Sequence, residues 1–318
     1  MLAPSPRRPI IRPRAGFTLI ELLAVIIVIM ILMALLAPAV MGAFRRVRIT
    51  AVRAEISQLE TAIGKFKATY GAEPPSMILL QENPANWDAT SRAVIRQLWP
   101  QYDFTSSIDI NGNSTTTDTI TLTGPECLVF FLSGPNVQNT PGTTPLNIGA
   151  CRGFSKNPAF PFDRTSVTRE GPLFEFLPSR FTDIDQDGFP EYVDPLPSQT
   201  APYLYYSAYD GGGYNSLSNT EFTLINTNFA GLIEPYRQGI GVNAPYFKPN
   251  GFQIISPGYD KQYGFGGAYV TTGSSRLPTS PTVDPQYPNA FSTAAPTSGQ
   301  RVFESDNITN FSEGTLAP

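Results

Sequence analysis

The sequence predicts an α+β fold in which one long N-terminal helix packs on a small antiparallel sheet with long loops. Leu22–Val40 is a run of 19 residues without a charge. After it, apolar residues recur every three or four positions as far as Tyr70, the pattern of an amphipathic helix. The whole chain contains 31 prolines and 26 glycines. These residues favour turns, short strands and ordered loops over further long helices.

The apolar run is long enough to span a bilayer. At about 1.5 Å per residue, a helix of this length covers roughly 28 Å, which is close to the thickness of the hydrocarbon layer. A secretory signal peptide would have a shorter apolar core followed by small residues at a cleavage site, whereas here the helical pattern continues beyond the run. We therefore expect a membrane-spanning helix over residues 17–42.

The helix is expected to continue beyond the membrane as an amphipathic segment over residues 43–70. Gly71 suits the cap at its C-terminal end, and Pro74-Pro75 prevent its continuation. The apolar residues of this segment recur every three or four positions and form one stripe that would face a core. They are Val52, Ile56, Leu59, Ile63, Phe66 and Tyr70.

A globular head is expected over residues 71–272, followed by a Ser/Thr/Pro-rich C-terminal loop or tail over residues 273–318. Apolar spacing predicts two short helices, Ala89–Trp99 and Pro125–Leu132, and the proline suits the first turn of the second one. A polar hairpin is expected over Ile108–Leu122. Strands are expected over Phe174–Leu177, Tyr203–Ala208 and Phe252–Ser256.

The chain contains no histidine, which limits its chemistry. Ser-His and Cys-His catalysis and His-ligated zinc are excluded, and no other nucleophile–base pair is evident, so we expect no enzyme. A net charge of -4 and a pI near 5.0 argue against nucleic acid as a partner. The basic residues instead cluster on both sides of the apolar run, at Arg7, Arg8, Arg12 and Arg14 and at Arg45, Arg46, Arg48 and Arg53.

The two cysteines, Cys127 and Cys151, allow two interpretations. In an oxidising compartment they could form one disulfide. The alternative is a pair of buried free thiols, and the sequence leaves both open.

Glu21 is an unusual residue at the start of the apolar run. A carboxylate within the end of a membrane helix is costly unless a cation lies close by. One interpretation is an interfacial residue whose side chain reaches the lipid headgroups. The other is a functional carboxylate that is paired with a positive charge.

The residues around this carboxylate resemble a known processing signal. The segment GFTLIELL (residues 16–23), which follows a short basic leader, is similar to the class III signal of type IV pilins and type II secretion pseudopilins. The resemblance implies that a prepilin peptidase cuts between Gly16 and Phe17, removes residues 1–16 as a leader peptide and N-methylates Phe17. The new amine of Phe17 would neutralise Glu21 in its own chain or in a neighbouring subunit.

Further short segments resemble the major (G-type) pseudopilin, here with large insertions in the head. Asp194-Pro195 followed by Pro202–Tyr205 is similar to its Asp-Pro-Trp-Gly-x-Pro-x-x-Tyr signature, although Leu196-Pro197 stand in place of Trp-Gly. Ser256–Asp260 resembles its Ser-x-Gly-x-Asp-Gly turn, and Asp306–Phe311 resembles its closing segment. The order of these matches along the chain favours the pseudopilin.

The resemblance implies a filament subunit of a type II secretion system, assembled from the inner membrane into a periplasmic pseudopilus for protein export. The implied partners are the prepilin peptidase, identical and related pseudopilins, the inner-membrane assembly platform with its ATPase, and membrane lipid before assembly. Pro38 matches the proline that many members carry late in this helix, where it can loosen the helix within the filament; a tolerated kink explains it equally well. The alternatives are a type IV pilin, major or minor, for adhesion, motility or DNA uptake at the cell surface, and a membrane-anchored hydrolase.

The acidic segment from Asp183 to Asp194 predicts a calcium loop. It follows the twelve-residue EF-hand loop, with Gly188 at the turn position. Calcium prefers about six to eight hard oxygen ligands, most of which this segment can supply. Asp194 stands where the longer Glu normally binds, so weak affinity is expected; the alternative is a solvated acidic turn. The expected ligands are Asp183, Asp185, Asp187, Glu191 and Asp194 through their side chains and Phe189 through its carbonyl.

The resemblance to pseudopilins implies a different calcium site, built by the C-terminal loop. Asp306 would carry over as a ligand, although Ser305 replaces the acidic residue before it, and Asp260 is a neighbouring candidate. Either ion would order a long loop that buries too little apolar surface to order itself.

Overall fold

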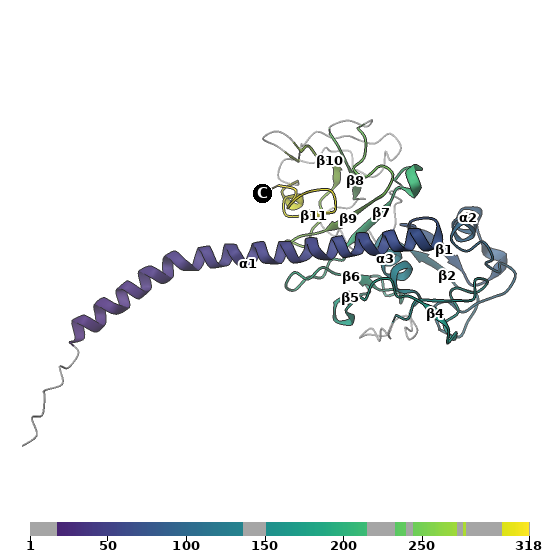
Figure 1. The fold of residues 1–318 in the computed structure, drawn as a ribbon, viewed down its shortest axis with the longest axis horizontal. Coiled ribbons are helices and arrows are strands. Elements are labelled where there is room, and N and C mark those ends of the chain that lie inside the picture. The colour runs from purple at the N-terminus through teal and green to yellow at the C-terminus, as the bar shows by residue number, and fades with distance from the viewer. Residues whose placement is uncertain are drawn as a thin grey trace, which may run out of the picture. The chain divides into compact units, whose positions relative to one another are not determined.

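The computed structural model describes residues 18–135, 151–214, 233–239, 244–271, 276–277 and 301–317 (Figure 1). The chain divides into two compact units, Met1–Val47 and Arg48–Pro318. Gly16 and Phe17 of the predicted cleavage site lie outside the described residues, as does the range 278–300 of the predicted C-terminal loop.

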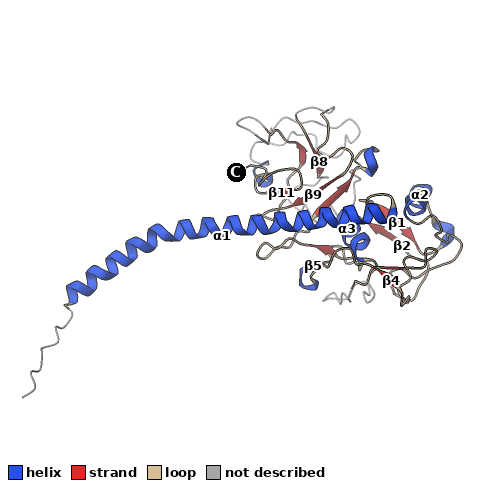
Figure 2. Ribbon diagram, viewed as in Figure 1, coloured by secondary structure: helices blue, strands red, loops and turns tan. Residues whose placement is uncertain are grey.

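One long helix precedes a series of short helices and strands, so the predicted α+β class is confirmed (Figure 2). The α-helices are α1 (Leu19–Tyr70), α2 (Ala89–Leu98) and α3 (Gly124–Ser133), and the 3-10 helices are η1 (Pro84–Asn86), η2 (Pro178–Arg180), η3 (Tyr209–Gly211) and η4 (Arg301–Glu304). The strands are β1 (Ile78–Gln81), β2 (Thr119–Leu122), β3 (Phe154–Ser155), β4 (Arg169–Glu170), β5 (Phe181–Thr182), β6 (Glu191–Tyr192), β7 (Leu204–Ser207), β8 (Glu234–Arg237), β9 (Phe252–Ser256), β10 (Gly266–Ala268) and β11 (Ile308–Thr309). Both predicted short helices, α2 and α3, are therefore confirmed.

Helix α1 is continuous through the apolar and the amphipathic segments, and Pro38 lies within it. Its side chains are exposed from Leu19 to Val47, and within the described part of the chain α1 is the helix long and apolar enough to cross a membrane. The predicted stripe is confirmed beyond that point. Val52, Ile56, Leu59, Ile63 and Phe66 are buried, and Tyr70 is partly buried against them.

The helix ends at Tyr70, as predicted. Gly71 adopts a left-handed conformation with φ of +84°, and its amide donates to the Lys67 carbonyl at 2.8 Å. A side chain at this position would be strained, which explains why glycine terminates the helix.

Aromatic side chains fill the core where α1, α2 and α3 meet. Phe66 of α1 contacts Phe131 of α3 edge to face, with ring centroids 5.8 Å apart, and Tyr70 contacts Trp99 at 5.1 Å. Such pairs contribute about 0.5–1.5 kcal/mol beyond the burial of their surface. A second buried cluster, rich in tyrosine, lies around β7, β8 and the C-terminal segment.

The largest sheet has three antiparallel strands in the order β11–β9–β7. Strand β9 coincides with the predicted Phe252–Ser256 and β7 lies within the predicted Tyr203–Ala208, so both predictions are confirmed. Strand β11 belongs to residues 301–317, which the sequence assigns to the C-terminal loop or tail. The other sheets have two strands each: β1–β2, β3–β4 and β5–β6 are antiparallel and β8–β10 is parallel.

Two predicted elements are wrong. Ile108–Leu122 is not a hairpin, because Thr119–Leu122 pairs with β1 instead of folding back on the residues before it. Those residues form a loop around the buried Glu82, whose Oε1 accepts from the Ile110 amide at 2.8 Å. Phe174–Leu177 is not a strand, because its aromatic rings pack on Tyr192, to which the Leu177 amide also donates.

Candidate assembly helix and metal-binding pocket

Glu21 lies in the first turn of α1, where it caps the helix. Its Oε2 accepts hydrogen bonds from the Thr18 amide at 2.8 Å and from the Thr18 hydroxyl at 2.7 Å, and the Glu21 amide donates to Thr18 Oγ1 at 3.3 Å. This reciprocal arrangement is a capping box, which satisfies amides that lack a partner within the helix. The carboxylate therefore faces the end of the helix that Phe17 precedes.

The predicted calcium loop forms a tight turn of alternating carboxylates between β5 and β6. Asp185 Oδ1 accepts from the Asp187 amide at 3.2 Å, and Asp187 Oδ1 accepts from the Phe189 amide at 2.7 Å. Gly188 has φ of +94° and donates its amide to Asp183 Oδ2 at 3.2 Å. One oxygen of each of these three carboxylates thus accepts from a backbone amide of the same turn.

The surroundings of the Asp183 carboxylate, which are partly buried and close to Asp185, disfavour its negative charge. Its Oδ1 is buried and has no hydrogen-bond partner among the described residues. Burial, together with the nearby charge of Asp185, raises the pKa of Asp183 to about 6. A bound cation would relieve both effects, because it would replace the lost solvation and offset the repulsion.

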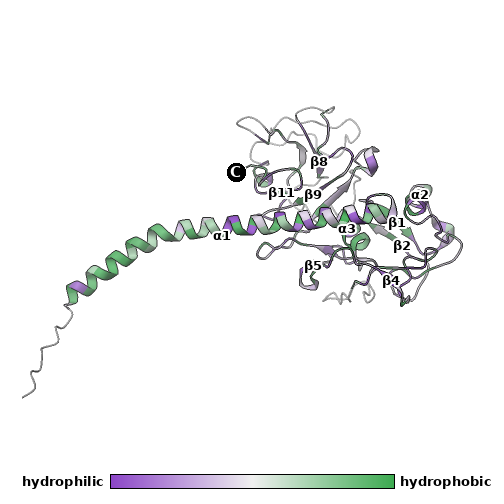
Figure 3. Cartoon of the chain, viewed as in Figure 1, coloured by the Kyte–Doolittle hydropathy of each residue, from purple (hydrophilic) through white to green (hydrophobic). Residues whose placement is uncertain are grey.

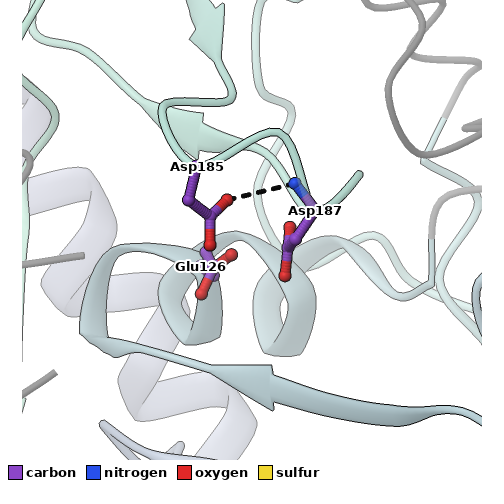
Figure 4. A group of neighbouring side chains, drawn as sticks. All are labelled: Glu126, Asp185 and Asp187. Carbon is purple, nitrogen blue, oxygen red and sulfur yellow. Dashed lines mark hydrogen bonds between the residues drawn. The ribbon is translucent and has the colours of Figure 1, made fainter. Parts of the chain in front are cut away.

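Glu126 lies beside two of the loop carboxylates, although it belongs to no metal-binding motif in the sequence. Ligand oxygens of Glu126, Asp185 and Asp187 all lie within 4.8 Å of one another (Figure 4). Glu126 is 1% exposed, and its Oε2 accepts from both the amide and the hydroxyl of Thr123 at the start of α3. In the sequence, Thr123 and Glu126 carry only the signal of a helix cap, so nothing there connects Glu126 to the loop.

The structure does not bring Asp194 to this group of carboxylates. Its Oδ1 accepts from the Leu196 amide at 2.8 Å, and its Oδ2 accepts from the Ser256 hydroxyl at 2.6 Å and the Gln199 side chain at 3.0 Å. Glu191 is fully buried, and its Oε1 accepts from the Ile184 amide at 3.2 Å. Asp194 therefore ties its own loop to the end of β9, which is a structural role.

A second loop, which was not among the predicted sites, has similar local hydrogen bonding. Asp109 Oδ2 accepts from the Ser114 amide at 3.0 Å, and Asn111 Oδ1 accepts from the Asn113 amide at 3.0 Å. Ser114 has φ of +69° at the position that Gly188 takes in the first loop. The signal in the sequence is Asp-Ile-Asn-Gly-Asn, which parallels the Asp-Ile-Asp-Gln-Asp of the first loop.

Both loops border one pocket of about 470 Å³. Its walls present carboxylate, amide and hydroxyl oxygens, which are the hard ligands that calcium prefers, so the residues present fit that ion. The lining residues are Asn111, Asn113, Asp118, Thr119, Ile120, Thr121, Thr123, Asp185, Asp187 and Phe189.

The second predicted pair of metal ligands, Asp260 and Asp306, lies together in the structure. Asp306 Oδ2 accepts from the amides of Tyr259 at 2.6 Å and of Asp260 at 3.2 Å. Burial and the charge of Asp306 raise the pKa of Asp260 to about 7. Cys127 is a buried free thiol of α3, and Cys151 is a partly buried free thiol whose pKa is raised by burial.

The N-terminal segment matches one family model, the prokaryotic N-terminal methylation motif, over residues 11–37. No curated protein and no solved structure matches the chain. Together with the long apolar helix, the motif supports a type IV pilin-like protein that is processed as a prepilin. The same helix is consistent with single-pass anchoring in the inner membrane.

Proposed function

We propose that this chain is a pseudopilin-like filament subunit of a type II secretion system. The observation that carries the proposal is the methylation motif at residues 11–37, placed on a helix whose apolar half is exposed. An apolar helix of this length needs lipid or other helices around it. Lipid surrounds it before assembly and the helices of neighbouring subunits surround it in the filament, so the work of the protein is mechanical.

Contacts within the head support a G-type pseudopilin. The three segments that resemble this class are far apart in the sequence, yet Ser256 bonds to Asp194 and Tyr259 bonds to Asp306. Gly258 has φ of +71°, and a Cβ there would lie 2.5 Å from the Asp306 carbonyl oxygen. Only glycine fits this turn, which is what a shared structural motif would require.

The Glu21→Gln variant is expected to be processed normally but to enter filaments poorly. It keeps the length of the side chain and removes the charge that the Phe17 amine would neutralise within the assembled bundle. We expect at least a ten-fold loss of the subunit from sheared or cross-linked filaments, measured against total processed protein by mass spectrometry. Glu313→Gln, an exposed acidic residue of the head, is the matched control. Normal assembly of Glu21→Gln would contradict the pairing.

The system that the filament serves is tested by deleting the gene. Loss of protein export across the outer membrane, restored by the wild-type gene but not by Glu21→Gln, is the result that we expect. Normal export together with loss of surface fibres, adhesion, motility or DNA uptake would instead identify a type IV pilin.

We also propose that calcium binds where Asp185 and Asp187 of the pocket wall approach Glu126 of α3. Asp185, Asp187 and Glu126 would supply carboxylate oxygens, and the Asn and Thr side chains of the wall offer further oxygen ligands. The ion would join the loop to α3 and so fix a segment that has little apolar surface of its own. Asp260 and Asp306 remain a second proposed site.

Calcium is expected to stabilise the head and Asp187→Ala to abolish that effect. At a concentration about 100-fold above the dissociation constant, a bound ion stabilises by about 2.7 kcal/mol, which chelation would remove. Since 1 kcal/mol corresponds to about 2–4 °C for a domain of this size, we expect a melting temperature about 5–11 °C lower in chelator for the wild type and no such difference for Asp187→Ala. Asp194→Asn is the matched control: it should melt lower in both conditions and keep the calcium-dependent shift. A wild-type melting temperature that is insensitive to chelator would overturn this proposal.

A further inference from the structure

The apolar segment of α1 is followed by four arginines within nine residues. The arginines are Arg45, Arg46, Arg48 and Arg53, and all four side chains are exposed. No acidic residue occurs between Leu22 and Ala54, so this stretch of helix carries four formal positive charges and no negative ones. Figure 3 shows the change along α1 from a green apolar stretch to a purple polar band.

The positions of Arg45, Arg46 and Arg48 along the helix correspond to the headgroup layer of a bilayer. A hydrocarbon layer of about 30 Å holds about 20 helical residues, so a span that begins at Leu22 ends near Met41. Arg45 then lies about 6 Å beyond the hydrocarbon and Arg48 about 10 Å beyond it. The headgroup layer is about 5–8 Å thick on each side, and the long side chain of Arg48 can reach back into it. Arg53, about 18 Å beyond the hydrocarbon, lies outside the layer.

Charge on this side of the membrane opposes the usual topology. Positive residues favour the cytoplasmic side, and the exported head lies on the other side. The leader supplies four opposing arginines, Arg7, Arg8, Arg12 and Arg14, but cleavage would remove them. After cleavage, therefore, most of the positive charge near the membrane lies on the head side.

We infer that Arg45, Arg46 and Arg48 form a lipid-binding collar that selects anionic phospholipids through their phosphate groups. Guanidinium groups bind phosphate through paired N–H donors, and they do so at the edge of the apolar helix, where the phosphates lie. The collar fixes the depth of the helix in the membrane before assembly. These contacts must be released when the subunit leaves the bilayer, so the collar also sets part of the cost of extraction. The inference rests on the membrane anchoring in the proposed function and not on the secretion role.

The test uses the processed chain, without residues 1–16 and their four arginines, in phosphatidylcholine vesicles that contain a trace of spin-labelled lipid. The fraction of motionally restricted spin label reports which lipids contact the helix. For the wild type we expect restriction of labelled phosphatidylglycerol to exceed that of labelled phosphatidylcholine, and 0.5 M salt (a condition of about three times physiological ionic strength) to reduce the difference. Each arginine near the surface contributes roughly a five-fold preference.

The variant R45Q/R46Q/R48Q should lose at least about five-fold of this preference while remaining inserted in the vesicles. R53Q/K65Q removes two charges from the same helix further from the membrane and should keep the preference. Equal restriction of the two lipids by the wild type would overturn the inference, as would an equal loss in both variants. Because the vesicles contain no secretion machinery, a failed export experiment would leave this result unaffected, and the reverse also holds.

Discussion

Replacing Glu55 by alanine is expected to lower the free energy of unfolding of the head by about 3 kcal/mol. Arg180 donates to both carboxylate oxygens of Glu55, at 2.9 and 2.5 Å, and the two side chains are only 17% and 13% exposed. The buried Tyr203 hydroxyl also donates to Glu55, at 2.8 Å. The variant would leave a largely buried guanidinium without this carboxylate and a buried hydroxyl without its acceptor, and both are costly.

The matched control for Glu55 is Glu60, which lies five residues further along α1 and also forms an ion pair with the head. Glu60 pairs with Lys248 at 3.5 Å, but these side chains are 30% and 45% exposed, and water screens the pair. Glu60→Ala should therefore cost about 1 kcal/mol or less, part of it through the lost bond to Asn310. Denaturant unfolding, followed by the fluorescence of the two head tryptophans, measures both variants. Equal losses of unfolding free energy in the two variants would show that the largely buried Glu55–Arg180 pair contributes no more than the exposed Glu60–Lys248 pair.

This pair has a mechanical consequence in the proposed filament. Force applied to the membrane half of α1 must reach the head through the contacts of the amphipathic half. The apolar stripe resists separation of helix and head, whereas a two-point ion pair also fixes their position along the helix axis. Arg180 holds this position firmly, because it donates to the Val193 carbonyl at 2.7 Å and lies 4.3 Å from the centre of the Tyr192 ring.

The sequence predicts those parts of the fold that depend on local patterns. The stripe from Val52 to Phe66 and the stop at Gly71 follow from helical spacing and glycine conformation, and both are observed. The strand β9 follows from a run of β-forming residues. The predicted hairpin at residues 108–122 is wrong because the pairing of strands depends on contacts between distant parts of the chain. Strand β2 pairs with β1, from which α2 separates it in the sequence, and the spacing of apolar residues does not indicate that partner.

The candidate metal pocket shows the same limit. Asp185 and Asp187 are recognisable because the loop motif is local, but Glu126 precedes them by nearly 60 residues and has the spacing of a helix cap. Asp194 shows the opposite case. It fits the last position of the motif, yet its carboxylate accepts hydrogen bonds from the Ser256 hydroxyl and the Leu196 amide. Which carboxylates meet is decided by how the loop folds onto α3, and the motif alone does not specify this.

Glu304→Ala is expected to release the C-terminal segment from the head at a cost of about 3–5 kcal/mol. Glu304 is fully buried and Arg301 is 4% exposed. The carboxylate accepts from Arg301 Nε at 2.9 Å and Nη2 at 2.6 Å, from the Tyr236 hydroxyl at 2.9 Å and from the Phe265 amide at 3.2 Å. One substitution thus removes the acceptor for donors from three segments that are distant in the sequence.

The loss should be concentrated where this network holds the chain. Strand β11 follows Glu304 by a few residues and completes the three-stranded sheet through the pairing of Ile308 with Ser256. Hydrogen exchange at the β11 amides should therefore accelerate by about 100-fold or more, since each 1.4 kcal/mol corresponds to a factor of ten. Glu313→Ala, an exposed residue of the same segment, should change exchange little.

A second variant separates the buried charge from the packing around it. In Arg301→Met/Glu304→Leu both charges are replaced by apolar groups of similar size, which often restores much of the stability that a single substitution removes. If the double variant protects β11 better than Glu304→Ala does, the buried guanidinium is the source of the loss. If hydrogen exchange at β11 is equally fast in both variants, the hydrogen bonds that Tyr236 and Phe265 donate to Glu304 hold the segment. The Arg301–Glu304 ion pair then contributes little to its stability.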